Sequence, residues 1–265
     1  MSDLLKQEMN SRNRRIFSFM ALGLFIVTII MAITGMETRT LDGWKWMNQF
    51  GAVTGVIELL TTIIVATRFA GQESNAQVKE NMKNHSKSSI FFSKVITILI
   101  SYLILLLVAI IAVILMKYLV FPHKPLARTL AQELSWAVLG NIAYFFIFQS
   151  FVMMIIGFCK TWYGAIAFGV ACTWITEIIA GIFMIFIYTH RKLIYNPFNF
   201  FFVEKQIQDG MKHMMTRLQL PMIIKGSLLY ALIFFIIAFI IFVYFRKFNT
   251  WNDDEEKNNQ DTKEA

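Results

Sequence analysis

Charged residues are scarce in this sequence. Asp, Glu, Lys and Arg make up 16% of its 265 residues and hydrophobic residues 57%, whereas roughly a quarter of an ordinary soluble domain is charged. A soluble fold of this length could not bury so much apolar surface in one core. The composition therefore predicts a protein embedded in a lipid bilayer.

Cysteine and histidine are also rare. The two cysteines, Cys159 and Cys172, predict neither a disulfide framework nor a metal site, and the four histidines share no metal-ligand spacing. The sequence contains no G-x-x-x-x-G-K-[ST] phosphate loop, no G-x-S-x-G elbow and no H-E-x-x-H helix. We therefore expect no metal, no catalytic residues and no ATP hydrolysis in this chain.

The net charge of +8 does not point to nucleic acid. The basic residues lie mostly between apolar runs, where they orient helices and meet anionic headgroups. No basic helix is interleaved with aromatic residues that could stack on bases. We expect membrane lipids, and no nucleic acid, as partners.

Six apolar runs are long enough to cross a bilayer, which takes roughly 20 helical residues. They are predicted at 16–36, 51–69, 90–121, 136–158, 162–188 and 222–245. The sequence thus predicts an all-α, polytopic membrane protein with six transmembrane helices. An even number of spans puts both termini on one side, and the basic cluster at 12–15 favours the cytoplasm.

Two connections are longer than tight turns. Residues 71–89 are polar and lysine-rich and are predicted on the cytoplasmic side. Residues 191–220 are predicted outside, where apolar residues at helical spacing favour an amphipathic helix along the membrane interface. These residues are Phe200, Val203, Ile207, Met211, Met214 and Leu218. Residues 249–265 are acid-rich and are predicted to form a disordered cytoplasmic tail.

Glu58 and Glu177 are acids within predicted spans. Ionisable groups in hydrocarbon are costly and usually face a protein interior or a watery path. One interpretation makes them the lining of a substrate pathway, together with Asn141. The other makes them hydrogen-bonded groups that hold helices together, a role that Asn141 and Gln149 also suit.

Small residues recur in the second and fifth runs. Gly51 and Gly55 form a G-x-x-x-G pair, and Ala165, Gly169 and Thr176 share one region of the fifth run. Such residues let helices approach closely. They predict either packing within the chain, which is the simpler hypothesis, or the seam of a dimer.

One cytoplasmic stretch carries a family resemblance. Residues 69–73, followed by Ser86-Lys87 and Ser93-Lys94, resemble the loop between the second and third spans of ABC-2-type exporter permeases. In that family a glutamate, here Glu73, follows the second span, then a short helix with a Gly-Thr pair, a Ser-Arg step and a Ser-Lys or Ala-Lys. Ala76-Gln77 stands near the Gly-Thr position here, and Lys87 replaces the arginine.

Further features resemble the same family across nearly the whole chain. Six spans follow a basic N-terminal segment, and Tyr195-Asn196-Pro197-Phe198 looks like the Y-x-P-F often found before the last span. The resemblance implies an ABC-2 (type V exporter-like) permease domain at 16–248, with an interfacial elbow at 1–15. Short permeases of this kind include exporters and immunity systems for antimicrobial peptides in bacteria.

The resemblance also implies partners. Two separate cytoplasmic ABC ATPase subunits would bind ATP and Mg, and a second copy or a sister permease would complete the pathway. Charged residues of the connecting loop would contact the ATPases: Glu73, Lys79, Glu80, Lys83 and Lys87. The cargo would be a hydrophobic or amphipathic peptide or lipid-like molecule crossing the bacterial cytoplasmic membrane. The alternative is a membrane immunity protein that sequesters such a molecule without transport.

Overall fold

The computed structural model describes residues 11–37, 43–69, 85–119, 130–159, 162–208 and 216–245. All regular secondary structure in these ranges is helical. The long helices are α2 (Ser11–Glu37), α3 (Gly43–Phe69), α5 (Lys87–Leu119), α6 (Leu130–Ile156), α7 (Trp162–Thr189) and α9 (Leu220–Ile240). The predicted all-α class is thereby confirmed for the described part of the chain.

Four stretches in these helices are long and apolar enough to cross a membrane. They are Lys87–Leu115, Leu134–Ile156, Tyr163–Thr189 and Pro221–Phe245. A shorter apolar stretch, Phe17–Ile30, lies in α2. These helices indicate a membrane-embedded protein. The spans predicted at 16–36 and 51–69 correspond to α2 and α3, whose crossing of the bilayer stays a prediction.

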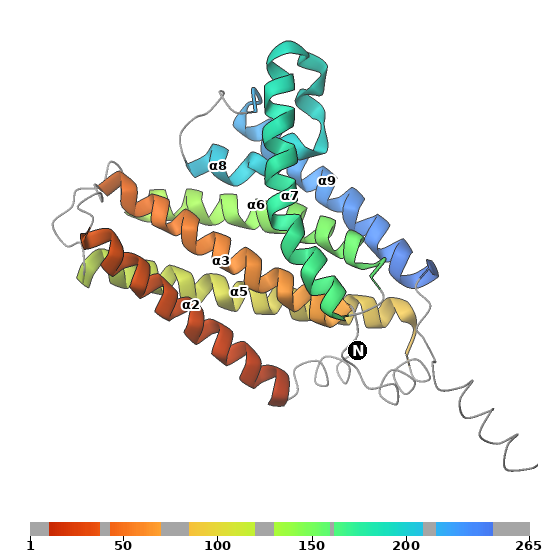
Figure 1. Cartoon of the computed structure of the whole chain (residues 1–265), viewed down its shortest axis with the longest axis horizontal. Helices are drawn as coiled ribbons and strands as arrows, with labels where there is room; N and C mark the ends of the chain where they lie inside the picture. Colours follow the sequence, from red (N-terminus) through yellow and green to blue (C-terminus); the bar gives the residue numbers. More distant parts are fainter. Residues whose placement is uncertain are drawn as a thin grey trace, which may run out of the picture.

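Helices α2, α3, α5 and α6 run roughly side by side, and α9 runs obliquely beside α6 (Figure 1). Helix α3 lies between α2, α5 and α6, and α9 packs along α6. Helix α7 crosses α3 and α6 and projects beyond them (Figure 1). The end of α3, the start of α5 and the end of α9 meet at one end of the bundle. The end of one helix thus lies beside the start of the next, as is expected for antiparallel neighbours.

That end of the bundle is filled by phenylalanines, which we name the aromatic cluster. Its members come from α3, α5, α9 and the π-helical turn η3 (Ile241–Phe245): Phe69, Phe91, Phe92, Phe235, Phe239 and Phe242. Phe91 is fully buried, and its ring contacts those of the other five at centroid distances of 5.2–5.7 Å. Edge-to-face pairs of this kind add about 0.5–1.5 kcal/mol beyond the burial of area.

Polar groups close the same end. Ser86 caps α5, because its Oγ accepts a hydrogen bond from the backbone N–H of Ser89 at 3.2 Å. The Lys87 Nζ donates to the carbonyl oxygen of Val243 at 3.3 Å, one of the last carbonyls of η3, which lack partners within a helix. Ser93 and Lys94, which take part in the family resemblance, are both buried on α5.

The connection between α7 and α9 differs from the predicted amphipathic helix. It forms two 3-10 segments, η1 (Arg191–Tyr195) and η2 (Pro197–Phe202), and the short helix α8 (Val203–Gln208). Phe200, Val203 and Leu218 are buried, because the segment folds back against α6, α7 and α9. Their helical spacing reflects burial inside the protein rather than contact with the membrane surface. Ile207, Met211 and Met214 lie outside the described side chains.

Two asparagines stabilise this connection. Asn196 caps η2 by accepting from the backbone N–H of Asn199 at 3.1 Å. The fully buried Asn199 donates to the carbonyl oxygens of Ile194 at 2.7 Å and Thr216 at 3.0 Å. Buried backbone carbonyl groups need hydrogen-bond partners. The Asn199 side chain supplies a partner for two carbonyl groups of this connection.

Glycine lets the connection approach α9. A Cβ built at Gly226 would overlap the ring of Phe200, so only glycine fits there without displacing that buried ring. The neighbouring Ser227 Oγ donates to the carbonyl oxygen of Phe200 at 3.2 Å. Tyr230, one turn further on, donates through its hydroxyl to the carbonyl oxygen of Tyr195 at 2.6 Å. Helix α9 is therefore the surface on which η1 and η2 are fixed.

Candidate functional site: an acidic pocket inside the bundle

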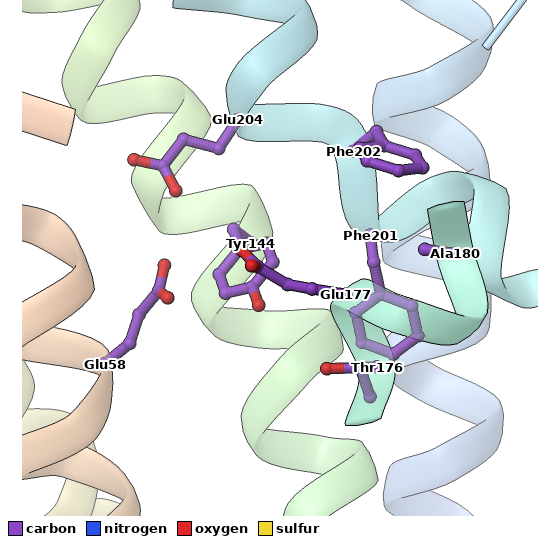
Figure 2. A pocket seen from close by; sticks show the side chains of 8 residues that line it. All are labelled: Glu58, Tyr144, Thr176, Glu177, Ala180, Phe201, Phe202 and Glu204. Carbon is purple, nitrogen blue, oxygen red and sulfur yellow. The ribbon is translucent and has the colours of Figure 1, made fainter. Parts of the chain in front are cut away.

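A cavity of about 30 Å³ opens between α3, α6, α7, η2 and α8. We name it the acidic pocket. Its walls are Glu58, Tyr144, Thr176, Glu177, Ala180, Phe201, Phe202 and Glu204 (Figure 2). A water molecule needs roughly 10–15 Å³ measured in the same way. The cavity is therefore large enough for a small polar group and too small for a whole peptide.

Three carboxyl groups from three elements meet at the acidic pocket. Glu58 lies near the middle of α3, Glu177 near the middle of α7, and Glu204 on α8. Figure 2 shows the carboxyl groups of Glu58 and Glu204 pointing toward the space beside Tyr144, with Glu177 entering from the other side. The Thr54 hydroxyl donates to the Glu204 Oε1 at 2.6 Å, which ties α8 to α3. No basic side chain lines the described pocket.

Tyr144 supplies the polar group of the α6 wall. Its side chain is only 7% exposed, and its ring stacks on that of Phe148 with centroids 5.3 Å apart. Within the described ranges, no hydrogen bond reaches its hydroxyl. Tyr144 therefore lines the pocket as a buried aromatic side chain that carries a polar hydroxyl group.

Helix α6 carries further polar side chains on either side of Tyr144 in the sequence. The Tyr102 hydroxyl donates to Asn141 Oδ1 at 2.5 Å, and its ring stacks on Phe145 at 3.7 Å. Gln149 Nε2 donates to the Thr62 Oγ1 at 3.3 Å. Among the described atoms, Asn141 Nδ2 and Gln149 Oε1 are buried without a hydrogen-bond partner. Polar side chains of α6 therefore contact α5 at Asn141 and α3 at Gln149.

The structure brings together two of the three residues proposed to line a pathway. Glu58 and Glu177 line the acidic pocket, although Glu177 is also exposed on α7. Asn141 is not among the residues that line the pocket, and its side chain accepts a hydrogen bond from Tyr102. Whether these residues act on a substrate stays a prediction.

The small residues fall into two groups. Ala165, Gly169 and Thr176 are buried, and a Cβ at Gly169 would lie 2.8 Å from Thr62 Cγ2 on α3. Gly55 faces open space, since a Cβ placed there would meet nothing within 4 Å; the surroundings of Gly51 lie outside the described side chains. Close packing inside the chain thus involves α7, and Gly55 leaves a bare patch on α3.

The predicted coupling residues fall mostly outside the described ranges. Glu73, Lys79, Glu80 and Lys83 are outside them, as are residues 1–10 and the tail 249–265. Lys87 is described and begins α5. Helix α2 begins at Ser11, inside the segment predicted as an elbow.

Sequence reasoning missed Glu204 and Tyr144. Glu204 stands in the connection predicted as an amphipathic helix, where an acid on the polar face carries no signal. Tyr144 looked like one of many aromatic residues in an apolar run. Only the folding of η2 and α8 against α6 places them beside Glu58.

Comparison of the chain with known proteins found no matching family, no matching curated protein and no matching solved structure. Within the described ranges, no three His, Cys, Asp or Glu side chains are grouped closely enough to hold a metal ion. The site is therefore defined by its geometry as a small acidic pocket within a bundle of apolar helices.

Proposed function

We propose that this chain is the membrane-spanning permease subunit of an ATP-binding-cassette exporter of the ABC-2 type, which moves a hydrophobic or amphipathic cargo out of a bacterial cell. The observation that carries the proposal is the acidic pocket, which lies near the middle of α3 and α7. Ionisable residues at such a depth are costly and typically mark a substrate or ion pathway. The resemblance of residues 69–94 supplies the class of transporter.

The ends of α3 and α5 suit a mechanical link to an ATPase. The segment proposed to contact the ATPase runs from the end of α3 to the start of α5, and Phe69 and Phe91 from those two ends pack together in the aromatic cluster. Phe242 joins them from η3, and Lys87 bonds to Val243. A displacement of the loop would therefore move α3, α5 and α9 together, and α3 carries Glu58.

In this proposal two ATPase subunits bind ATP and Mg, and two permease subunits form the pathway. Nucleotide can drive the permease between inward- and outward-facing states only through a difference in its affinity for the two states. The loop transmits that difference to the helices. This chain itself binds no nucleotide.

Co-purification from the native host in mild detergent tests the proposal. We expect a nucleotide-binding subunit and ATPase activity to accompany the tagged chain, and to be lost when Lys79 and Lys83 are both replaced by Glu. Lys87 is left intact because it bonds to Val243. Lys192→Glu is the control for charge reversal. Lys192 is exposed on η1, which is not part of the loop proposed to contact the ATPase. A chain that crosslinks to no ATPase would overturn the proposal.

A second candidate is a sequestering immunity protein that holds an amphipathic peptide without moving it. The acidic pocket supports this candidate as well as it supports the permease, because sequestration requires a binding pocket but no ATPase. It predicts that protection of the host survives the loss of any ATPase gene and the Lys79→Glu, Lys83→Glu double variant. The permease predicts that both changes abolish protection.

A further inference from the structure

We propose that the end of α7 binds an anionic phospholipid, with the headgroup on a basic patch and the acyl chains along the helix. The basic patch consists of Tyr188, Arg191 and Arg217, which are all exposed. Three observations support the proposal: the way in which Arg217 is held, the charge of the patch, and an apolar stripe that leads to it. The proposal is independent of whether the chain transports a cargo or sequesters one.

Arg217 is held in place by its neighbours in the chain. Its φ of 55° lies in the left-handed region, which is unfavourable for a residue that has a Cβ. Thr216 and Leu218 on either side are buried, and the Thr216 Oγ1 donates to Gln206 Oε1 at 2.7 Å. The Arg217 guanidinium lies over the ring of Tyr188, 4.3 Å from its centroid. Because unfavourable backbone conformations that persist cluster at functional sites, this arginine is a candidate for binding.

The basic patch has no acid beside it among the side chains that the structure describes. Arg191 begins η1, directly beyond the end of α7, and Arg217 reaches the same end through its contact with Tyr188. The acidic side chains that are described all line the acidic pocket. Glu177, on the same helix, is eleven residues before Tyr188, which corresponds to about 16 Å along a helix. Two arginines of this kind suit a phosphate group, which accepts paired charge-assisted hydrogen bonds from a guanidinium.

An exposed apolar stripe runs along α7 to the basic patch. Ile178, Ile182 and Ile185 are 61%, 49% and 70% exposed. Their spacing of four and three residues, continued by three more to Tyr188, places the four side chains on one face of the helix. From Ile178 to Tyr188 a helix rises about 15 Å, which is half of the roughly 30 Å of the hydrocarbon core. The stripe thus matches the acyl chains of one leaflet and ends at a tyrosine, a residue enriched at headgroup level.

The match of length and charge favours a lipid over a free phosphate ion. The test uses the purified chain in a neutral detergent, titrated with phosphatidylglycerol or with phosphatidylcholine that has the same acyl chains. Native mass spectrometry gives the affinity of the first lipid bound. We expect phosphatidylglycerol to bind at least tenfold more tightly, because only its headgroup carries a net negative charge for the two arginines.

Variants assign the preference to the basic patch. The Arg191→Gln, Arg217→Gln double variant should bring the two affinities to within about twofold of each other. Arg217→Lys should reduce their ratio about threefold, because lysine keeps the charge but loses the planar, bidentate guanidinium. Lys225→Gln is the control, since it removes an exposed charge from α9, outside the patch, and should leave the ratio unchanged. Constant binding of phosphatidylcholine reports that these variants are folded.

A second pair of measurements separates the lipid from its headgroup. The Ile182→Ser, Ile185→Ser double variant should weaken the binding of both lipids by a similar factor and leave their ratio unchanged. Glycerol phosphate, which lacks acyl chains, should not displace phosphatidylglycerol at equal concentration. Displacement by glycerol phosphate would overturn the proposal and make the patch a site for free anions. Equal affinities of the wild-type chain for the two lipids, or a preference that survives the loss of both arginines, would also overturn it.

Discussion

Helix α3 takes part in two regions of opposite character. At its end, Phe69 enters the aromatic cluster, where six rings pack against one another. At its middle, Glu58 faces a small cavity with two more carboxyl groups and a phenol. One region is dry and filled, and the other is polar and partly empty.

The aromatic cluster consists of residues that stabilise the fold, whereas the acidic pocket contains residues that lower its stability. Close-packed aromatic rings stabilise the bundle directly. Carboxyl groups in a membrane-embedded bundle destabilise it, and natural proteins depart from good packing chiefly at functional sites. Changes in the two regions should therefore alter stability in opposite directions.

The largest effect should come from emptying the aromatic cluster. Phe91→Ala should lower the free energy of unfolding by about 3–5 kcal/mol, because it removes a fully buried ring and leaves a cavity. Denaturant titration of the detergent-solubilised chain measures it. Phe92→Ala is the control, since Phe92 is 42% exposed and should cost much less. Equal losses of stability in Phe91→Ala and Phe92→Ala would mean that Phe91 is not the packed centre of the aromatic cluster.

The next effect concerns the contact between α9 and η2, the segment that carries Phe201 and Phe202 of the pocket wall. Gly226→Ala should cost about 2 kcal/mol, because its methyl group displaces the buried ring of Phe200 by overpacking, which outweighs the better helix propensity of alanine. The same denaturant titration measures it. Gly181→Ala is the control, since a Cβ there meets nothing within 4 Å. A neutral Gly226→Ala would show that the connection moves freely on α9.

A change of opposite sign is expected inside the pocket. Glu58→Leu should raise the free energy of unfolding by about 1–2 kcal/mol, because an apolar side chain replaces a partly buried carboxyl group. Under the proposed function it should also abolish export. Thermal unfolding followed by an export assay gives both results. A destabilised variant would favour the other interpretation of Glu58, in which it holds helices together.

The smallest effect separates chain packing from a dimer seam. Gly55→Ala should change stability by less than about 0.5 kcal/mol, since Gly55 faces open space, whereas Gly169→Ala should cost about 1 kcal/mol against Thr62. Chemical crosslinking in membranes shows whether the bare patch around Gly55 contacts a second copy. Loss of crosslinked dimer in Gly55→Ala, with stability unchanged, would assign the patch to a seam.

The positions of the long helices could be predicted from the sequence, because a helix that crosses the bilayer requires a run of roughly 20 apolar residues. The run at 162–188 matches α7 within a residue at its end, and that at 90–121 matches α5 within three residues. Helix α3 begins eight residues before the predicted run, at Gly43 rather than 51. Its first two turns contain Lys45 and Asn48, which lower the apolar content without preventing a helix.

The pocket was only half predictable. Glu58 and Glu177 stood out because acids are rare in apolar runs, but nothing in the sequence placed them side by side. Glu204 reaches them because Asn199, Gly226 and Ser227 fix the connection against the bundle. Such contacts join residues far apart in the chain, and the local apolar pattern of Phe200 and Val203 suits a surface helix just as well.

Helix α7 must also enter the membrane while the chain is being synthesised, and its composition bears on that step. Glu177 is its only Asp, Glu, Lys or Arg, at a central position where an acid costs about 2.5–3.5 kcal/mol in insertion. Its eleven Ile, Phe and Val residues each return about 0.3–0.6 kcal/mol. The helix can therefore insert as an independent segment with its carboxyl group in place, before α8 and α9 exist to build the rest of the pocket around it.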